Sequence, residues 1–226
     1  MWTLGIDTAT WSASVGVARD GDAVAERTVR AETHALAIIA LIEETLAAAG
    51  ITVRDLDGIA VSAGPGSFTG LRIGLSTAKG IAYAHGAQLV LVPTLHALAR
   101  AAGPRTGTVC TVLDARKGEI YTAAFRWHGD TLEQTIADCA ITPQRLREVI
   151  RAGDLTFVGD GVDRYGDLLR EQFGASASYL GITTAPPSGA VVARIGWEQI
   201  QIGNTTALDV AEPFYVRPSE AERNFA

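Results

Sequence analysis

The stretch TLGIDTATWSASVGVA, residues 3–18, has the pattern that decides the fold. Residues 3–7 form a β-type run that ends in Asp7, and residues 12–18 form a second run after a threonine-rich turn. Asp20-Gly21, a favoured hairpin turn, then leads into a third run at 23–27. The chain is therefore predicted to open with three antiparallel strands, the first of which ends in an aspartate.

Helices and strands alternate after this opening. We predict helices over 33–49, 70–85 and 94–102 and strands over 59–62 and 87–92, with Thr33 as the first N-cap and Gly50 as the first stop. This alternation is typical of an α/β unit. The run GPRTG at 103–107 then interrupts the pattern, because Gly and Pro favour turns. We place a lobe boundary there, with residues 1–103 before it and 104–226 after it.

The second lobe repeats the opening of the first. Residues 108–114 predict a strand that ends in Asp114, and residues 115–118 turn the chain into another strand at 119–127. We further predict helices at 143–152, 164–173 and 188–202, a strand at 155–158, and a tail from Pro213 without regular structure throughout. The sequence thus predicts an α/β protein of two related lobes, the second reduced in size.

The composition excludes several classes of protein. With 226 residues, 47% hydrophobic and 19% charged, the chain can bury a sizeable core. Its formal net charge is −6 and lysine occurs only at positions 79 and 117, which argues against tight binding of nucleic acid by this chain alone. The two cysteines form no CxxC pair, and we find neither a signal peptide nor an apolar run long enough to span a bilayer. We therefore expect a cytoplasmic protein without a membrane anchor.

The turn IDTAT at 6–10 has two interpretations. Asp7, Thr8 and Thr10 at the end of a strand could hold a phosphate or its hydrated cation, and Asp114 occupies the matching position in the second lobe. The same residue types also form turns in which side chains bond their own backbone, and residue type alone favours that interpretation. The repetition at Asp114 is what makes a vestigial phosphate-binding loop worth testing.

The loop GPGSFTG at 64–70 also has two interpretations. Glycines before a helix allow backbone amides to approach an anion, but this is not a P-loop, because Leu71 and Arg72 stand where Lys and Ser or Thr are needed. A tight strand-to-helix turn capped by Ser67 or Thr69 explains the residues equally well.

The helix after this loop contains small residues at every fourth position. Because an interior Gly costs about 1 kcal/mol relative to Ala, a compensating close contact should exist, either within the lobe or with a partner. The preceding helix is apolar over more than one stripe, which favours a partner. The candidate interface comprises Leu36, Ile39, Ala40, Glu43, Gly70, Leu71, Gly74, Leu75, Ala78 and Ala82.

Other polar residues give weaker signals. The four histidines lack the spacing of metal ligands, no GxSxG motif is present, and we predict neither a metal site nor catalytic residues. Asp160, Asp163 and Asp167 in GDGVDRYGD are interpreted as a solvated loop and helix start.

Five motifs together resemble one family. They are IDTAT at 6–10, GPGSFTGLRIG at 64–74, DARKGEIY at 114–121, VGDG at 158–161 and EPFYVRPSE at 212–220. With them the chain resembles the TsaB (YeaZ) family, short members of the actin-like (ASKHA) ATPase superfamily related to TsaD. The resemblance implies pairing with TsaD, and with TsaE in a larger assembly, so that a threonylcarbamoyl group reaches N6 of adenosine 37 in tRNAs reading ANN codons. It also implies a homodimer in isolation, formed through the first-lobe helices.

The chain differs from TsaD at one pair of residues that TsaD uses to bind a metal. TsaD carries two metal-binding histidines in HxxxH spacing, whereas this chain has His96 and Arg100 at that spacing. The resemblance therefore implies a non-catalytic subunit that binds no cofactor alone, with ATP or ADP and a metal on the partner subunits and tRNA contacted only through the complex. The alternative is an actin-fold phosphotransferase or a degenerate metallopeptidase-like enzyme, which a complete nucleotide site would favour.

Overall fold

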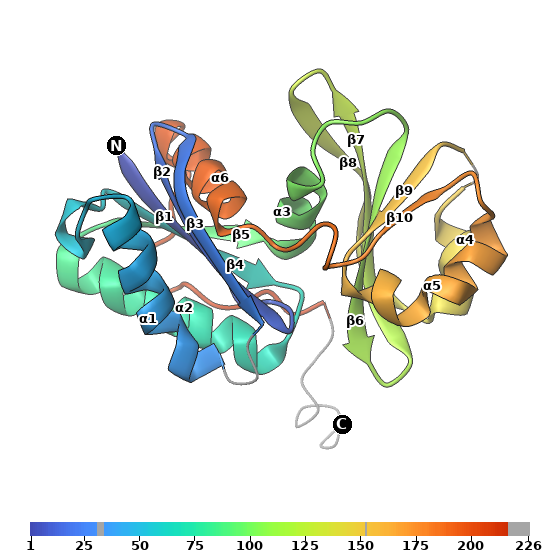
Figure 1. The fold of residues 1–226 in the computed structure, drawn as a ribbon, viewed down its shortest axis with the longest axis horizontal. Coiled ribbons are helices and arrows are strands. Elements are labelled where there is room, and N and C mark those ends of the chain that lie inside the picture. Colours follow the sequence, from blue (N-terminus) through green and yellow to red (C-terminus); the bar gives the residue numbers. More distant parts are fainter. Residues whose placement is uncertain (31–33, 152, 217–226) are drawn as a thin grey trace.

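Two five-stranded sheets form the framework of the protein (Figure 1). The computed structural model describes residues 1–30, 34–151 and 153–216. The first sheet has the order β3-β2-β1-β4-β5, in which β1 pairs antiparallel with β2 and parallel with β4. Its strands are β1 (Trp2–Asp7), β2 (Ser12–Arg19), β3 (Asp22–Arg30), β4 (Gly58–Gly64) and β5 (Gln88–Pro93).

The second sheet repeats this arrangement. Its order is β8-β7-β6-β9-β10, and β6 pairs antiparallel with β7 and parallel with β9, as β1 does with β2 and β4. Its strands are β6 (Thr108–Arg116), β7 (Glu119–His128), β8 (Thr131–Ile141), β9 (Leu155–Val158) and β10 (Ser178–Leu180). The predicted repeat of strand, Asp, turn and strand is therefore present, with Asp7 at the end of β1 and Asp114 near the end of β6.

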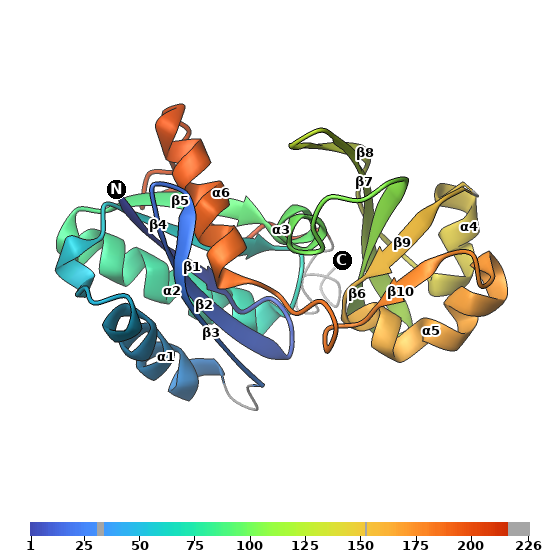
Figure 2. The ribbon, with the colours of Figure 1, turned by 45° about the horizontal axis from the view of Figure 1, so that its top comes forward.

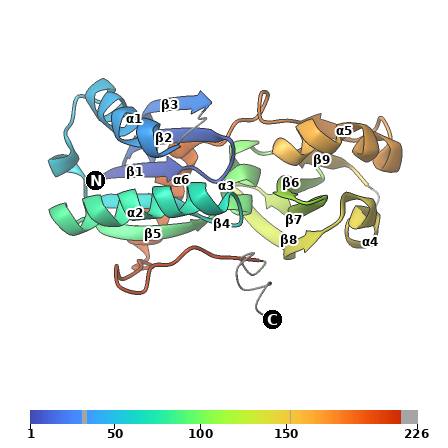
Figure 3. The same ribbon diagram turned by 90° about the horizontal axis from the view of Figure 1, so that it is seen from below.

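Helices cover both faces of the first sheet. Helices α1 (His34–Ala48) and α2 (Phe68–His85) lie side by side on one face, and α6 (Gly189–Gln201) crosses the other (Figures 1 and 3). A short 3₁₀ helix, η1 (Val53–Asp55), precedes β4. The core on the α1–α2 side contains Leu4, Ile6, Ile38, Leu75 and Ala78, all nearly inaccessible to solvent.

The last helix of each half packs against the sheet of the other half. Helix α3 (Thr94–Ala101) follows the first sheet, but its Leu95 and Leu98 lie in a core with residues of the second sheet. Helix α6 follows the second sheet, but its Val192 and Ile195 lie in a core with β4 and β5 (Figure 2). The predicted boundary at 103/104 lies between α3 and β6, yet a single cut does not divide the chain into two separate lobes.

The remaining helices cover the second sheet. They are η2 (Pro143–Arg145), α4 (Leu146–Val149) and α5 (Asp160–Phe173). The helix predicted at 143–152 is thus shorter, because Ile150 has extended backbone angles; its predicted last residue, 152, lies outside the described residues. Helix α5 starts four residues earlier than predicted and bends at Tyr165. The predicted cap Thr33 also lies outside the described residues.

Candidate partner-binding surface and the two aspartate turns

The turn after β1 is held by its own polar side chains. The Oδ1 atom of Asp7 accepts the Ala9 N–H at 3.0 Å, and Oδ2 accepts the Ser62 hydroxyl at 2.6 Å. The Thr8 hydroxyl donates to the carbonyl of Gly70 at 2.7 Å, and the Thr10 hydroxyl exchanges bonds with the backbone of Ser12. All three candidate residues are buried. Their oxygens therefore stabilise the turn and its contact with α2, as the turn interpretation predicts.

Asp114 forms the same kind of turn in the second half. Its Oδ1 accepts the Arg116 N–H at 3.0 Å, the same distance as in the first turn. Its Oδ2 lies 3.1 Å from Nη1 of Arg164, so the carboxylate is paired with a guanidinium. The N–H of Asp114 donates to Asp160 at 2.8 Å, and burial raises the pKa of Asp160 to about 6. The repeated aspartate thus serves the same local role in both halves.

The loop between β4 and α2 rests on the first turn. The Ser67 N–H donates to the Ala9 carbonyl at 2.7 Å, and Ser67 Oγ accepts the Gly70 N–H at 3.3 Å. The capped-turn interpretation is therefore confirmed at Ser67. A Cβ atom at Gly70 would lie 2.0 Å from the Thr8 carbonyl oxygen, so only glycine permits this close approach.

The small residues of α2 face the interior of their own lobe. Ala78 and Leu71 are fully buried, and a Cβ atom at Gly74 would lie 2.3 Å from Thr8 Oγ1. The close contact that offsets Gly70 and Gly74 is therefore intramolecular. The predicted interface is corrected accordingly, because six of its residues are buried and cannot contact a partner of the folded chain: Gly70, Leu71, Gly74, Leu75, Ala78 and Ala82.

The opposite side of the same helices is exposed. In α1, Ile39 is 51% exposed, and Ala40 and Glu43 are also exposed, as predicted for an interface; the side chain of Leu36 lies outside the described residues. At 3.6 residues per turn, Ser76, Gly80 and Tyr83 lie on the side of α2 opposite Ala78. Tyr83 is 84% exposed, and a Cβ atom at Gly80 would have no neighbour within 4 Å. We call the six residues Ile39, Ala40, Glu43, Ser76, Gly80 and Tyr83 the outer face.

The exposed residues of the outer face of α2 are not among the interface residues predicted from the sequence. The four-residue period of Gly70, Gly74 and Ala78 drew attention to the side of the helix that is buried in the fold. The signal that could have found them is Gly80, a mid-helix glycine outside that period, followed by a large aromatic residue on the same side.

His96 and Arg100 of α3 are engaged within the protein. The half-buried ring of His96 packs edge-on against Phe125 at 5.8 Å, and burial lowers its pKa. Arg100 makes two hydrogen bonds of 2.5 and 2.6 Å to Glu198 of α6. This pair joins α3 and α6, the two helices that pack against the sheet of the other half. Among the described residues, no group of three or more His, Cys, Asp and Glu side chains could hold a metal ion. None of the described helices is long and apolar enough to cross a membrane.

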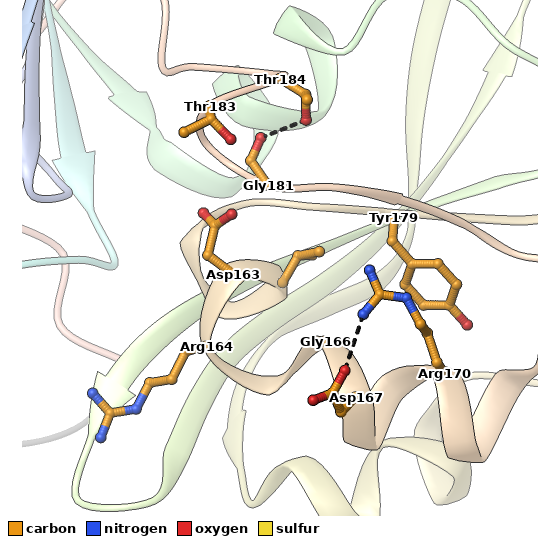
Figure 4. A pocket seen from close by; sticks show the side chains of 10 residues that line it. Asp163, Arg164, Gly166, Asp167, Arg170, Tyr179, Gly181, Thr183 and Thr184 are labelled. Atoms are coloured by element: carbon orange, nitrogen blue, oxygen red, sulfur yellow. Dashed lines mark hydrogen bonds and ion pairs between the residues drawn. The ribbon is translucent and has the colours of Figure 1, made fainter.

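A polar pocket of about 330 Å³ lies beside α5 (Figure 4). Asp163 accepts the Ile182 N–H at 2.9 Å, and Asp167 pairs with Arg170 at 3.3 Å. The three aspartates of GDGVDRYGD therefore do not converge: Asp160 is turned to Asp114, Asp163 to a loop and Asp167 to an arginine. Within the lining, Asp167 bonds to Arg170 and Thr184 to Gly181, whereas Asp163, Arg164 and Tyr179 bond to groups outside the pocket.

Comparisons with known proteins agree on one relationship. The model of the family described as "TsaD: tRNA N6-adenosine threonylcarbamoyltransferase" matches residues 27–222. The tRNA threonylcarbamoyladenosine biosynthesis protein TsaB of Escherichia coli strain K12 is 30% identical over 98% of this chain and 96% of its own length. The protein of the same name from Bacillus subtilis strain 168 is 26% identical over the same shares.

Solved structures show the same fold. YeaZ from Pseudomonas aeruginosa superposes with a TM-score of 0.79 at 23% identity, covering 95% of this chain and 99% of that chain. The two sheets of matching order are those of the actin-like ATPase fold, as predicted.

Proposed function

Because this chain belongs to the TsaB (YeaZ) family of tRNA threonylcarbamoyladenosine biosynthesis proteins, we propose that it is a non-catalytic scaffold and activating subunit. It pairs with TsaD, and with TsaE in a larger assembly, for transfer of a threonylcarbamoyl group to N6 of adenosine 37 of tRNAs that read ANN codons. TsaD binds to the outer face of α1 and α2. In isolation the chain forms a homodimer through this same face, so the two associations compete.

The observation that carries this proposal is the outer face of α1 and α2. Gly80 costs α2 about 1 kcal/mol relative to Ala, and none of the residues that the structure describes lies close enough to require a glycine there. Gly80 and Ser76 leave room for a helix of another chain to approach, and the exposed Tyr83 beside them is a residue type enriched at interfaces. This combination supports a protein partner that docks across the middle of α2.

The geometry of the polar residues supports placing the chemistry on the partners. The carboxylate of Asp7 and the hydroxyl of Thr8 are bonded to the chain's own groups. Arg100, at the position of the second histidine of the TsaD motif, is held by Glu198. ATP or ADP and the metal therefore bind to the partner subunits, and the negative net charge of this chain leaves tRNA contact to the complex.

Reconstitution tests the non-catalytic role. The isolated chain incubated with threonine, bicarbonate, ATP and tRNA should form no threonylcarbamoyladenosine, and product should appear once TsaD, TsaE and the adenylate-forming enzyme are added. Product or steady ATP hydrolysis by the purified chain alone would instead favour the phosphotransferase or peptidase-like alternative. Tight tRNA binding by the chain alone, with a Kd below about 1 µM at about 0.15 M salt, would contradict the indirect role of tRNA.

A matched pair of variants tests the surface. Gly80→Trp places a bulky side chain on the outer face and should abolish pairing with TsaD and with a second copy. The fold should be retained, because Gly80 is exposed and no described residue lies within 4 Å of a Cβ atom there. Gly80→Ala adds only a methyl group and should weaken both associations less than Gly80→Trp does. Unchanged association of Gly80→Trp in a pull-down and in light scattering would rule out this surface.

A further inference from the structure

The chain after α6 returns across the first half of the molecule. Residues 203–216, which we call the C-terminal strap, run along the β5 side of the first sheet toward the start of α2 (Figure 3). The Thr206 N–H donates to the Leu89 carbonyl at 2.8 Å, and the Phe214 N–H donates to the Ala63 carbonyl at 2.7 Å. Between these points Ala211 is only 2% exposed. The strap is thus bound to the sheet and is not a loose tail.

Both cationic side chains near the strap in α2 donate to it. Lys79 Nζ donates to the Ala211 carbonyl at 3.0 Å, and Arg72 Nε donates to the Tyr215 hydroxyl at 3.1 Å. A Cβ atom at Gly64 would lie 2.1 Å from the Phe214 carbonyl oxygen, so the strap backbone lies directly on the end of β4. These contacts join two motifs that are far apart in the sequence, GPGSFTGLRIG and EPFY.

The contact produces an exposed group of aromatic side chains. The rings of Phe68 and Tyr215 stack with their centroids 5.2 Å apart, and the Arg72 guanidinium lies 3.9 Å from the centroid of the Phe68 ring. Phe68 is 40%, Tyr215 37% and the neighbouring Phe214 55% exposed. We call Phe68, Arg72, Phe214 and Tyr215 the aromatic anchor. Large apolar side chains cost free energy in water unless something covers them.

We propose that the aromatic anchor binds TsaD directly and supplies most of the binding free energy at one end of the docking surface. This inference rests on the proposed function. At 3.6 residues per turn, Phe68 and Arg72 lie on the same side of α2 as Tyr83, so the anchor continues the outer face toward the N-terminus of the helix. Residues that dominate protein interfaces are mainly Trp, Tyr and Arg, held in position by neighbours. The strap therefore takes part in partner binding as well as in folding.

The chemistry of the anchor favours a protein over RNA. Stacked aromatic residues also bind single-stranded bases, but such sites combine them with free cations that follow the phosphates. Here Arg72 and Lys79 donate to the strap, and the whole chain carries a net charge of −6. An apolar surface with its cations engaged in this way fits a protein partner.

Titration of purified TsaD into the full chain, followed by calorimetry, tests the proposal. Phe68→Ala and Phe214→Ala should each weaken association about tenfold or more, as expected for residues that dominate an interface. Tyr215→Phe keeps the stacked ring, loses only the bond to Arg72 and should bind nearly as the wild type does. Val210→Ala, in the same strap and 67% exposed, is the control for substitution without an anchor contact.

Melting temperatures and RNA binding separate the outcomes. Phe68→Ala leaves the strap sequence intact, so weaker association with unchanged melting in this variant supports the anchor even if Phe214→Ala loosens the strap. Wild-type association in both alanine variants, when Gly80→Trp abolishes it, would overturn the anchor and leave the proposed function standing. Lower tRNA affinity with unchanged TsaD association would overturn it in favour of base stacking. No association of the wild type with TsaD would overturn both proposals.

Discussion

Replacement of two glycines in α2 by alanine should change stability in opposite directions. Gly74 and Gly80 lie in the interior of the same helix, so alanine gains the same helix propensity at both, about 1 kcal/mol. At Gly80 the new methyl group has no neighbour within 4 Å among the described residues, so the gain should be realised in full in the monomer. For a chain of this length that gain raises Tm by about 2–4 °C.

At Gly74 the new methyl group would lie 2.3 Å from Thr8 Oγ1. Thr8 is fully buried, and its hydroxyl donates to the Gly70 carbonyl at 2.7 Å, so it cannot move aside without breaking that bond. Overpacking costs about 1–3 kcal/mol and loss of the buried hydrogen bond about 1 kcal/mol more. After the gain in propensity, Gly74→Ala should be about 1–3 kcal/mol less stable than the wild type.

Urea unfolding followed by circular dichroism measures both variants under one set of conditions. Changes in midpoint at constant slope report stability directly. Equal stabilisation by both substitutions would refute the assignment of the small residues to the interior. At a protein concentration where the chain is monomeric, destabilisation by Gly80→Ala would show that another part of the same chain covers the outer face.

Three further predictions concern other parts of the molecule. Glu198→Ala leaves the half-buried Arg100 without its partner and should lower the free energy of unfolding by about 1–3 kcal/mol; a change below about 0.5 kcal/mol in urea would mean that this pair is not holding α3 to α6. Because the pKa of Asp160 is raised to about 6, its carboxyl binds a proton more tightly in the folded chain, so this group should reduce stability by about 3 kcal/mol as pH rises from about 4 to above 6. Asp160→Asn should remove that part of the pH dependence, and parallel profiles for the variant and the wild type would contradict the assignment. Burial raises the pKa of the Cys110 thiol to about 12, so it should resist alkylation at pH 8 until the chain unfolds, whereas rapid labelling of the native protein would show an open path to it.

Turns and caps could be predicted from the sequence because the hydrogen bonds that form them join residues close together in the chain. An aspartate at the end of a strand accepts the N–H two residues later, and the same bond recurs at Asp7 and Asp114. Ser67 caps α2 through a bond to an amide three residues on. Such bonds need only neighbouring residues, so pattern and spacing are sufficient to predict them.

Two strands of the second half were not predicted because their sequences carry little signal. β8, TLEQTIADCAI, is exposed or half-buried at the edge of its sheet and contains two acidic residues, Glu133 and Asp138. β10 is only three residues long. Both are strands because β7 and β9 offer them backbone partners. β7 directly precedes β8 across the turn at 129–130, whereas β9 is separated from β10 by the whole of α5.

Sequence patterns alone predicted the repeated opening of strand, Asp, turn and strand, the capped turn before α2, the four-residue spacing of small side chains and, by resemblance, the family. They could not determine which side of α2 is buried, because small residues allow close approach equally to the chain's own sheet and to a partner. Nor could they show that α6 crosses to the first sheet or that the strap brings Tyr215 onto Phe68. These points follow from the folded arrangement, because burial depends on which distant elements compete for the same surface.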